Sequence, residues 1–163
     1  MNPNESKTES TPQAPASDTS PPEGQWSTGI CGCFDDVTSC CVTCWCPCIT
    51  FGRTAEIVDK GKISCFTAAR NCFMLAYVFG IGACIYTCTY RAKLRAHYSL
   101  PPKPCGDCCV HYFCFYCALC QEHRELKNRG LDPEGGWVAA EANAKKLRGR
   151  TTAPPVPSPG MTR

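Results

Sequence analysis

The stretch Cys72–Tyr90 (CFMLAYVFGIGACIYTCTY) constrains the fold most, because its 19 residues include no charged side chain. Arg70 precedes the stretch and Arg91 follows it. As one helix rising 1.5 Å per residue, it would be about 28 Å long, close to the ~30 Å hydrocarbon core of a bilayer. A buried helix of a soluble domain is the alternative. The length and the flanking arginines favour one membrane-spanning helix over residues 72–90.

Small side chains recur every four residues within this stretch, at Cys72, Ala76, Gly80, Cys84 and Cys88. On one helix they would form a single ridge, and small residues at this spacing let two membrane helices approach closely. A general abundance of Gly and Ala in membrane helices is the other explanation. We predict that the ridge is a self-association face and that the chain forms a homo-oligomer.

Two shorter apolar segments, Cys40–Phe51 and Cys108–Cys120, lie on either side of this stretch. Each has about a dozen residues, too few to span a bilayer, so we expect them to be re-entrant, interfacial or packed against the long helix. Both begin with Cys-Cys-Val and continue into a charged helix that ends at a glycine. Counted back from Gly61 and Gly130, three pairs match: Cys48 with Cys117, Glu56 with Glu125, and Ile57 with Leu126. Chance similarity between Cys-rich segments is the alternative explanation. The match predicts one helical unit used twice, in which each copy ends at a glycine with a left-handed backbone conformation.

All 17 cysteines fall between Cys31 and Cys120, a density typical of small secreted proteins held by disulfides. The count is odd, however, and the amino terminus lacks the basic and apolar regions of a cleaved signal peptide. We therefore expect most thiols to face a reducing compartment or to lie in the bilayer. The net charge of +3 is small and dispersed, which argues against a nucleic-acid partner.

Polar, proline-rich tails flank the cysteines. Residues 1–25 and 138–163 hold too little apolar surface to offset the entropy of ordering them, so we predict that both are disordered. Between them we predict one small Cys-rich, membrane-associated domain over residues 26–137. Its fold class is mainly α, with the long apolar helix and the two short Cys-rich segments.

The segment Cys40–Cys48 (CCVTCWCPC) carries five thiols in nine residues, separated by Val, Thr, Trp and Pro. Zinc fingers separate their cysteines with polar turns, so this pattern favours soft-metal chemistry at a membrane or a set of acylation sites. An extended chain would align Cys44, Cys46 and Cys48 on one face, and Pro47 would kink the segment there. Packing of free cysteines as small apolar side chains is the third reading.

A second group of thiols follows the long stretch. Ligands three residues apart on a helix would form a slanting stripe that ends at a histidine. The secondary candidates for metal binding are Cys105, Cys108, Cys117, Cys120 and His123.

No motif in the sequence supports an enzymatic function. The chain has no Gly-rich phosphate loop and no recognisable partner motif for a Cys-His nucleophile. Acidic residues on the two short charged helices are expected on solvated faces: Glu56, Asp59, Glu122 and Glu125. We predict a protein that is not an enzyme and needs no obligatory cofactor.

The motif Cys40-Cys41-x-x-x-x-Cys46-Pro47-Cys48 resembles the signature of the plant cadmium resistance, cell number regulator and fruit-weight proteins. These form the plant branch of the placenta-specific-eight family. The resemblance covers roughly Trp26 to Gly136 and includes the segments WSTG (26–29), ITFGRTAEIVDKG (49–61) and QEHRELKNRG (121–130).

The resemblance implies a small plasma-membrane protein that forms homo-oligomers. Members of the family are associated with heavy-metal tolerance, with zinc or cadmium export, and with control of cell number and organ size. Their CCxxxxCPC motif is the part linked to metal resistance. It maps onto four candidate ligands supported by Pro47, namely Cys40, Cys41, Cys46 and Cys48.

Two functions follow from these observations. The first is heavy-metal resistance by transport, efflux or sequestration of soft divalent ions, with zinc or cadmium as the bound or transported ion and membrane lipid as a partner. The alternative is an S-acylated membrane scaffold that regulates cell number and organ size without transporting anything.

Overall fold

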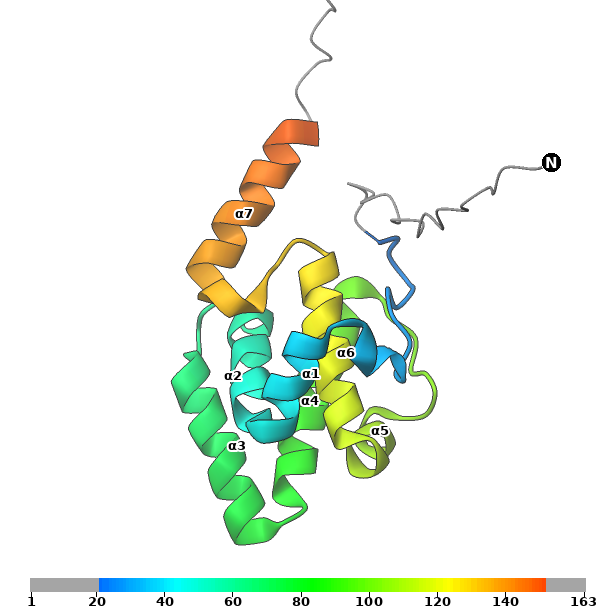
Figure 1. Cartoon of the computed structure of the whole chain (residues 1–163), viewed down its shortest axis with the longest axis vertical. Coiled ribbons are helices and arrows are strands. Elements are labelled where there is room, and N and C mark those ends of the chain that lie inside the picture. The colour runs from blue at the N-terminus through cyan, green and yellow to red at the C-terminus, as the bar shows by residue number, and fades with distance from the viewer. Residues whose placement is uncertain (1–20, 152–163) are drawn as a thin grey trace, which may run out of the picture.

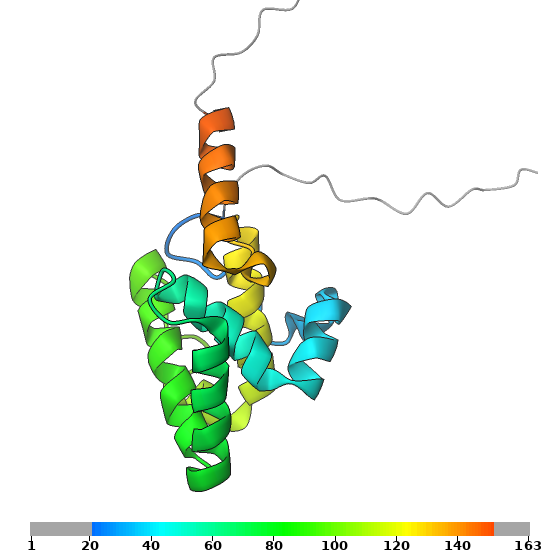
Figure 2. The same cartoon turned by 90° about the vertical axis from the view of Figure 1, so that its left-hand side faces the viewer.

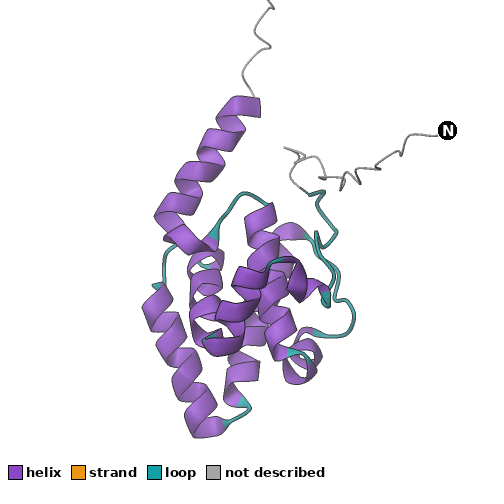
Figure 3. Cartoon of the chain, in the orientation of Figure 1, coloured by secondary structure: helices purple, strands orange, loops and turns teal. Residues whose placement is uncertain are grey.

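The computed structural model describes residues 21–151, and every regular element in that range is a helix (Figure 3). The prediction of a mainly α, Cys-rich fold is confirmed. Two short 3₁₀ helices, η1 and η2, accompany seven α-helices within the described range. In chain order the elements are η1 (Gly32–Asp35), α1 (Val37–Trp45), α2 (Pro47–Val58), α3 (Cys65–Phe79), α4 (Gly82–Tyr98), α5 (Asp107–Phe113), α6 (Phe115–Asn128), η2 (Pro133–Gly135) and α7 (Gly136–Thr151).

Helices α3 and α4 form a hairpin, with the two helices running side by side in both views (Figures 1 and 2). The prediction of one long helix over residues 72–90 is wrong, because the chain turns back at Gly80 and Ile81. Gly80 has φ +55° and ψ −78°, a conformation that glycine adopts readily because it has no Cβ. None of the helices between residues 21 and 151 combines the length and the apolar character that crossing a bilayer requires.

The same turn divides the predicted ridge of small residues between two helices. Cys72 is buried in α3, and Cys88 is buried in α4. Ala76 and Gly80 are exposed, the first near the end of α3 and the second in the turn. The ridge is therefore not one continuous face, and formation of a homo-oligomer stays a prediction.

The repeated unit is confirmed as two helix pairs, α1–α2 and α5–α6, each joined through a single non-helical cysteine. Cys46 has φ −139° and ψ 69°, and Cys114 has φ −130° and ψ 44°. Pro47 explains the first break, because proline disfavours a helical conformation in the residue before it and fits the first position of a helix. Each unit closes at a glycine with positive φ, +74° at Gly61 and +79° at Gly130.

The matched residues of the two units have matched roles. Ile57 of α2 and Leu126 of α6 are buried in the same apolar cluster. Glu56 accepts hydrogen bonds from the backbone N–H groups of Cys65 and Trp137, both at 3.0 Å. Glu125 accepts one from the backbone N–H of Ser27 at 2.7 Å. In both units the glutamate therefore ties a neighbouring segment to the end of its helix.

Helix α2 lies at the centre of the domain and packs against α1, α3, α4, α6 and α7. Phe51 of α2 is fully buried, and its ring meets those of Tyr86 and Tyr90 edge-on at centroid distances of 5.3 and 5.2 Å. A Cβ on Gly52 would come within 2.5 Å of the backbone oxygen of Cys65. The close approach of α2 and α3 therefore depends on glycine at that position.

A buried polar network joins α4, α5 and α6. Arg91 is 1% exposed and pairs with the fully buried Glu122 at 3.1 Å. His111, also fully buried, places Nε2 at 2.8 Å from the same carboxylate oxygen and Nδ1 at 3.0 Å from the hydroxyl of Thr87. The ring of Trp26 covers the Arg91 guanidinium at 4.3 Å. The expectation that Glu122 lies on a solvated face is wrong, and so is the same expectation for Glu125.

Helix α7 covers residues 136–151 and projects from the end of the domain opposite the α3–α4 turn (Figures 1 and 2). Its residues from 138 onward belong to the predicted C-terminal tail, which therefore starts with a helix. Residues 1–20 and 152–163, which make up the rest of the two predicted tails, lie outside the described residues.

We predict that Glu122→Ala lowers the free energy of unfolding by about 3 kcal/mol, because it removes the closer of the two carboxylates beside the buried Arg91 charge and leaves only Asp107, 3.5 Å from its Nε atom. Denaturant titration of the purified protein measures this loss. The double variant Arg91→Met/Glu122→Leu should lose less than Glu122→Ala, because it leaves neither charge of the pair behind. A loss below about 1 kcal/mol for Glu122→Ala would contradict the buried pair.

We also predict an acid-sensitive contribution from Asp36, which caps α1. Its carboxylate accepts hydrogen bonds from the N–H of Ser39 at 3.1 Å and from Lys127 at 3.1 Å. The Ser39 bond, with Lys127 contributing, lowers the pKa of Asp36 from 3.8 to about 2. The stabilisation is therefore complete above pH 3.8 and disappears as the pH falls through about 2.

At neutral pH, Asp36→Ala should cost about 1 kcal/mol, whereas Asp36→Asn, which keeps a capping oxygen, should cost less. Unfolding measured across the acid range should show the Asp36→Ala penalty shrinking toward pH 2. A penalty that stays constant down to that pH would exclude the charged cap.

Candidate functional site

Thiols from both repeated units meet between α1 and α6. The Cys40 thiol interacts with those of Cys44 and Cys120, and the Cys117 thiol interacts with that of Cys33. Cys33 also lies within electrostatic range of Cys40 and Cys120. We call these five residues the two-repeat thiol cluster.

Local structure explains why these thiols gather. Cys40 and Cys44 are four residues apart on α1, and Cys117 and Cys120 are three apart on α6, so each pair shares one helix face. Cys33 comes from η1, which Arg124 of α6 holds in place.

The Arg124 guanidinium pairs with Asp35 of η1 at 2.9 Å and also donates to the backbone oxygen of Gly32. The Thr43 hydroxyl donates to the Ser39 carbonyl at 2.7 Å, and its oxygen lies 3.0 Å from the Thr50 hydroxyl oxygen. The contacts of Arg124 anchor η1 on α6, and the Thr43–Thr50 contact joins α1 to α2.

The surroundings of Cys40, Cys117 and Cys120 raise the pKa of these three thiols and favour their protonated form at neutral pH. Loss of hydration, followed by the neighbouring Cys120 and Cys44, raises the pKa of Cys40 to about 11. Burial, followed by Cys33, raises the pKa of Cys117 to about 11 as well. Thiols are poor nucleophiles in this state, and they bind metal ions by giving up their protons.

The predicted ligand set of the CCxxxxCPC motif is not brought together at one point. Cys40 belongs to the two-repeat thiol cluster, whereas Cys41 and Cys46 are exposed. Cys48 lies in α2 against Cys72, whose pKa is raised first by burial and then by Cys48. The chain breaks before Pro47, as expected, but only Cys46 separates the two helices, so no extended segment aligns Cys44, Cys46 and Cys48.

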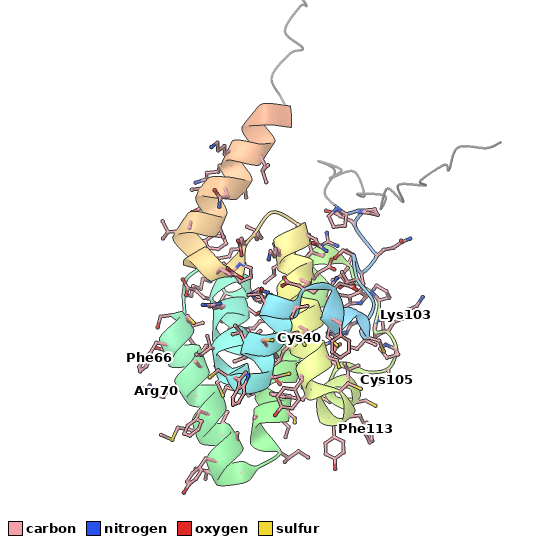
Figure 4. The ribbon with its side chains drawn as sticks, viewed as in Figure 1. Cys40, Phe66, Arg70, Lys103, Cys105 and Phe113 are labelled. Carbon is pink, nitrogen blue, oxygen red and sulfur yellow. The ribbon has the colours of Figure 1, made fainter. Side chains whose placement is uncertain are left out.

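The secondary set is also divided. Cys117 and Cys120 join the two-repeat thiol cluster, but Cys105 pairs with Cys109, and Cys108 contacts Cys88 of α4. Figure 4 shows Cys105 well to the side of Cys40.

His123 is buried, with Nδ1 at 3.4 Å from the Ser39 hydroxyl, and burial lowers its pKa. Across residues 21–151, no three or more His, Cys, Asp or Glu side chains are arranged so that they could hold a metal ion.

Two members of the cluster, Cys33 and Cys44, were absent from the ligand sets predicted from the sequence. Cys44 lies one helical turn after Cys40, so a helical assignment for α1 would have revealed it. Cys33 comes from a 3₁₀ turn, and no sequence pattern connects it to α6.

A second surface feature is an exposed apolar end, which we call the apolar tip. It joins the α3–α4 turn to α5, because Ile81 and Ile85 line one pocket of about 290 Å³ together with Tyr112 and Phe113. Figure 4 shows Phe113 projecting from the body at this end of the molecule. The exposed side chains of the tip are Phe73, Met74, Tyr77, Val78, Phe79, Ile81, Ile85, Tyr112 and Phe113.

The apolar tip contains no charge of its own. Residues 71–90 and 108–121 include no Asp, Glu, Lys or Arg. Soluble proteins rarely expose a contiguous apolar area of this kind unless it contacts a partner or a membrane. Aromatic rings with a polar atom, such as those of Tyr77 and Tyr112, are typical of the boundary between lipid and water.

Comparison with known proteins identifies the family. The PLAC8 family model matches residues 26–125. The chain is 53% identical to Cell number regulator 7 of Zea mays over 143 residues, which cover 85% of this chain and 79% of the relative. It is 60% identical to Cell number regulator 10 of Zea mays over 113 residues, covering 69% and 71% of the two chains.

The chain is also 49% identical to Protein PLANT CADMIUM RESISTANCE 2 of Arabidopsis thaliana over 141 residues, covering 86% of this chain and 92% of the relative. No solved structure gives a significant match. The chain therefore belongs to the PLAC8 family, in the plant branch that includes cell number regulators and plant cadmium resistance proteins.

Proposed function

We propose that this protein confers heavy-metal resistance by capturing soft divalent ions, cadmium and zinc, while docked on the plasma membrane. The observation that carries the proposal is the two-repeat thiol cluster, in which thiols of both repeated units lie close enough to shift one another's pKa. The likeness to proteins named for cadmium resistance supports it. The metal ion is the cargo of the protein.

Capture exchanges protons for metal. Each thiol that binds the ion loses its proton, and thiolates replace the water molecules around a soft ion such as Cd²⁺. The cluster offers more thiols than a four-coordinate ion needs. Because the cluster does not form a finished cage in the described residues, capture requires its thiols to draw together. Helix α1 is joined to α2 through Cys46 alone, which makes such a movement local.

The apolar tip supports membrane docking in the same proposal. Its side chains are exposed and uncharged, and they lie at the end of the domain opposite α7. Inserting these side chains into the lipid boundary removes apolar area from water, at about 25 cal/mol per Å².

Sequestration is the form of resistance that the thiol cluster supports directly. Transport or efflux by a homo-oligomer is the alternative mechanism of metal resistance. Cadmium flux in proteoliposomes separates the two, because sequestration retains the ion and moves none across the bilayer.

A scaffold that regulates cell number is the second candidate function. Cys41 and Cys46 are exposed on either side of Trp45, whose side chain is 87% exposed. A thiol beside an exposed aromatic residue is suited to S-acylation at a membrane surface. The likeness to proteins named cell number regulators supports this candidate.

We predict that Cys117→Ser/Cys120→Ser weakens cadmium binding at least about tenfold, because it removes two thiols of the cluster. The matched control is Cys41→Ser/Cys46→Ser, which removes two exposed thiols and should leave the affinity unchanged. Chelator competition against CdCl₂ under reducing conditions, with metal analysis by mass spectrometry, gives both affinities. If the control variant lost affinity and Cys117→Ser/Cys120→Ser did not, the capture site would lie in the CCxxxxCPC motif and the two-repeat thiol cluster would be excluded as the site.

We predict that Phe79→Glu lowers binding to neutral phosphatidylcholine vesicles at least about tenfold, since burying one phenylalanine is worth about 1.5–3 kcal/mol. Phe66→Glu is the matched control, because Phe66 is also an exposed phenylalanine of α3 but lies at the opposite end of that helix (Figure 4). Vesicle flotation measures both variants. Equal losses in the two variants, or no loss in either, would rule out docking through the apolar tip.

A further inference from the structure

The thiols of Cys88 in α4 and Cys108 in α5 are in direct contact. Their sulfur atoms are 2.7 Å apart, only a little farther than the ~2.05 Å of a bonded pair. Cys88 is 5% exposed, whereas Cys108 is exposed. Neither residue belongs to the two-repeat thiol cluster, and the pair therefore has no part in the proposed capture of metal.

Ion pairs hold the two helices together beside this pair. Asp107, the residue before Cys108, lies 3.5 Å from the Nε atom of Arg91 and also pairs with Arg95. Both arginines belong to α4. The start of α5 is thus fixed on α4 by contacts that involve neither sulfur, so that a bond between the thiols requires little movement of the backbone.

We propose that Cys88 and Cys108 are a reversible disulfide site, oxidised by a low-molecular-weight disulfide such as oxidised glutathione. The proposal is independent of the proposed function. Because the bond would join α5 to α4, the attachment of α5 would depend on the ratio of disulfide to thiol in the surrounding solution.

The reaction balances as two successive exchanges. The Cys108 thiolate attacks one sulfur of the small disulfide, forms a mixed disulfide and releases one small thiolate. Cys88 then loses its proton and attacks the Cys108 sulfur, which releases the second small thiolate. The protein loses two electrons and two protons, and the small disulfide is reduced to two thiols.

Exposure sets the order of the two steps. Cys108 is open to solvent and meets the small disulfide first. Burial, followed by the contact with Cys108, raises the pKa of Cys88 to about 12. Cys88 is therefore the resolving thiol, and its attack, which needs a thiolate, is the slower step.

Oxidation would act on the apolar tip. The pocket of about 290 Å³ between α4 and α5 is lined by Cys108 together with Ile85, Tyr112 and Phe113. A bond from Cys88 to Cys108 fixes α5 against α4 on one side of this pocket. The apolar side chains of α5 are then held at the hairpin in one arrangement.

The test is differential alkylation of the purified chain before and after incubation with oxidised glutathione. Chymotrypsin cuts after Tyr86 and Tyr90, which isolates Cys88 in the peptide 87–90. We expect this peptide to be joined to the one that contains Cys108, with fragmentation assigning the bond to that residue. Adding excess reduced glutathione should release both thiols.

Two matched variants make the result decisive. Cys109→Ser removes the neighbouring exposed thiol and should leave the bond intact, whereas Cys108→Ser should leave Cys88 reduced. The oxidised wild type and Cys109→Ser should melt at a higher temperature than their reduced forms, and Cys108→Ser should show no such gain. Overturning results are a bond from Cys88 to Cys105 or Cys109, or a Cys88 thiol that stays reduced in excess oxidised glutathione.

Discussion

The ion pair between Arg91 and Glu122 is the constraint on which the arrangement of the domain depends. A charged side chain that is buried away from water needs an opposite charge beside it. The pairing of Arg91 with Glu122 therefore fixes the position of α4 along α6. His111 brings α5 to the same carboxylate, and Trp26 closes the other side of the guanidinium. The thiols on α6 and those around α5 have defined neighbours because these helices cannot slide past each other.

The repeated unit explains how a small chain builds two different surfaces. Helices α2 and α6 occupy matching places in the two units and pack against each other, which brings α1 beside α6 and gathers thiols from both units. The α3–α4 hairpin is inserted between the units, and the described residues that follow the second unit, up to residue 151, form no second hairpin of this kind. The α3–α4 hairpin supplies most of the exposed side chains of the apolar tip. The two-repeat thiol cluster is therefore built mainly by the two units, whereas most of the apolar tip is built by the hairpin between them.

The two units could be predicted from the sequence because their signals are local, namely Cys-Cys-Val at the start and glycine at the end. The turn at Gly80 could not, since isolated glycines such as Gly80 and Gly82 in a charge-free run are compatible with a helix. The burial of Glu122 was missed because its partner, Arg91, is distant in the sequence and is brought close only by the tertiary fold. Cys40, Cys117 and Cys120 were predicted as ligands separately, but their meeting depends on how α1 packs on α6.

The turn at Gly80 has a consequence for the depth that the apolar stretch can reach. A straight helix of its length would extend about 28 Å, whereas a stretch folded back on itself extends about half as far. Both arms of the hairpin return to the same side. A chain docked by this hairpin adds area to one leaflet of a bilayer and none to the other. It would act as a wedge in the leaflet that it enters. Binding would therefore favour membranes that are convex on the side of the protein, and many copies together would bend a flat membrane in that direction.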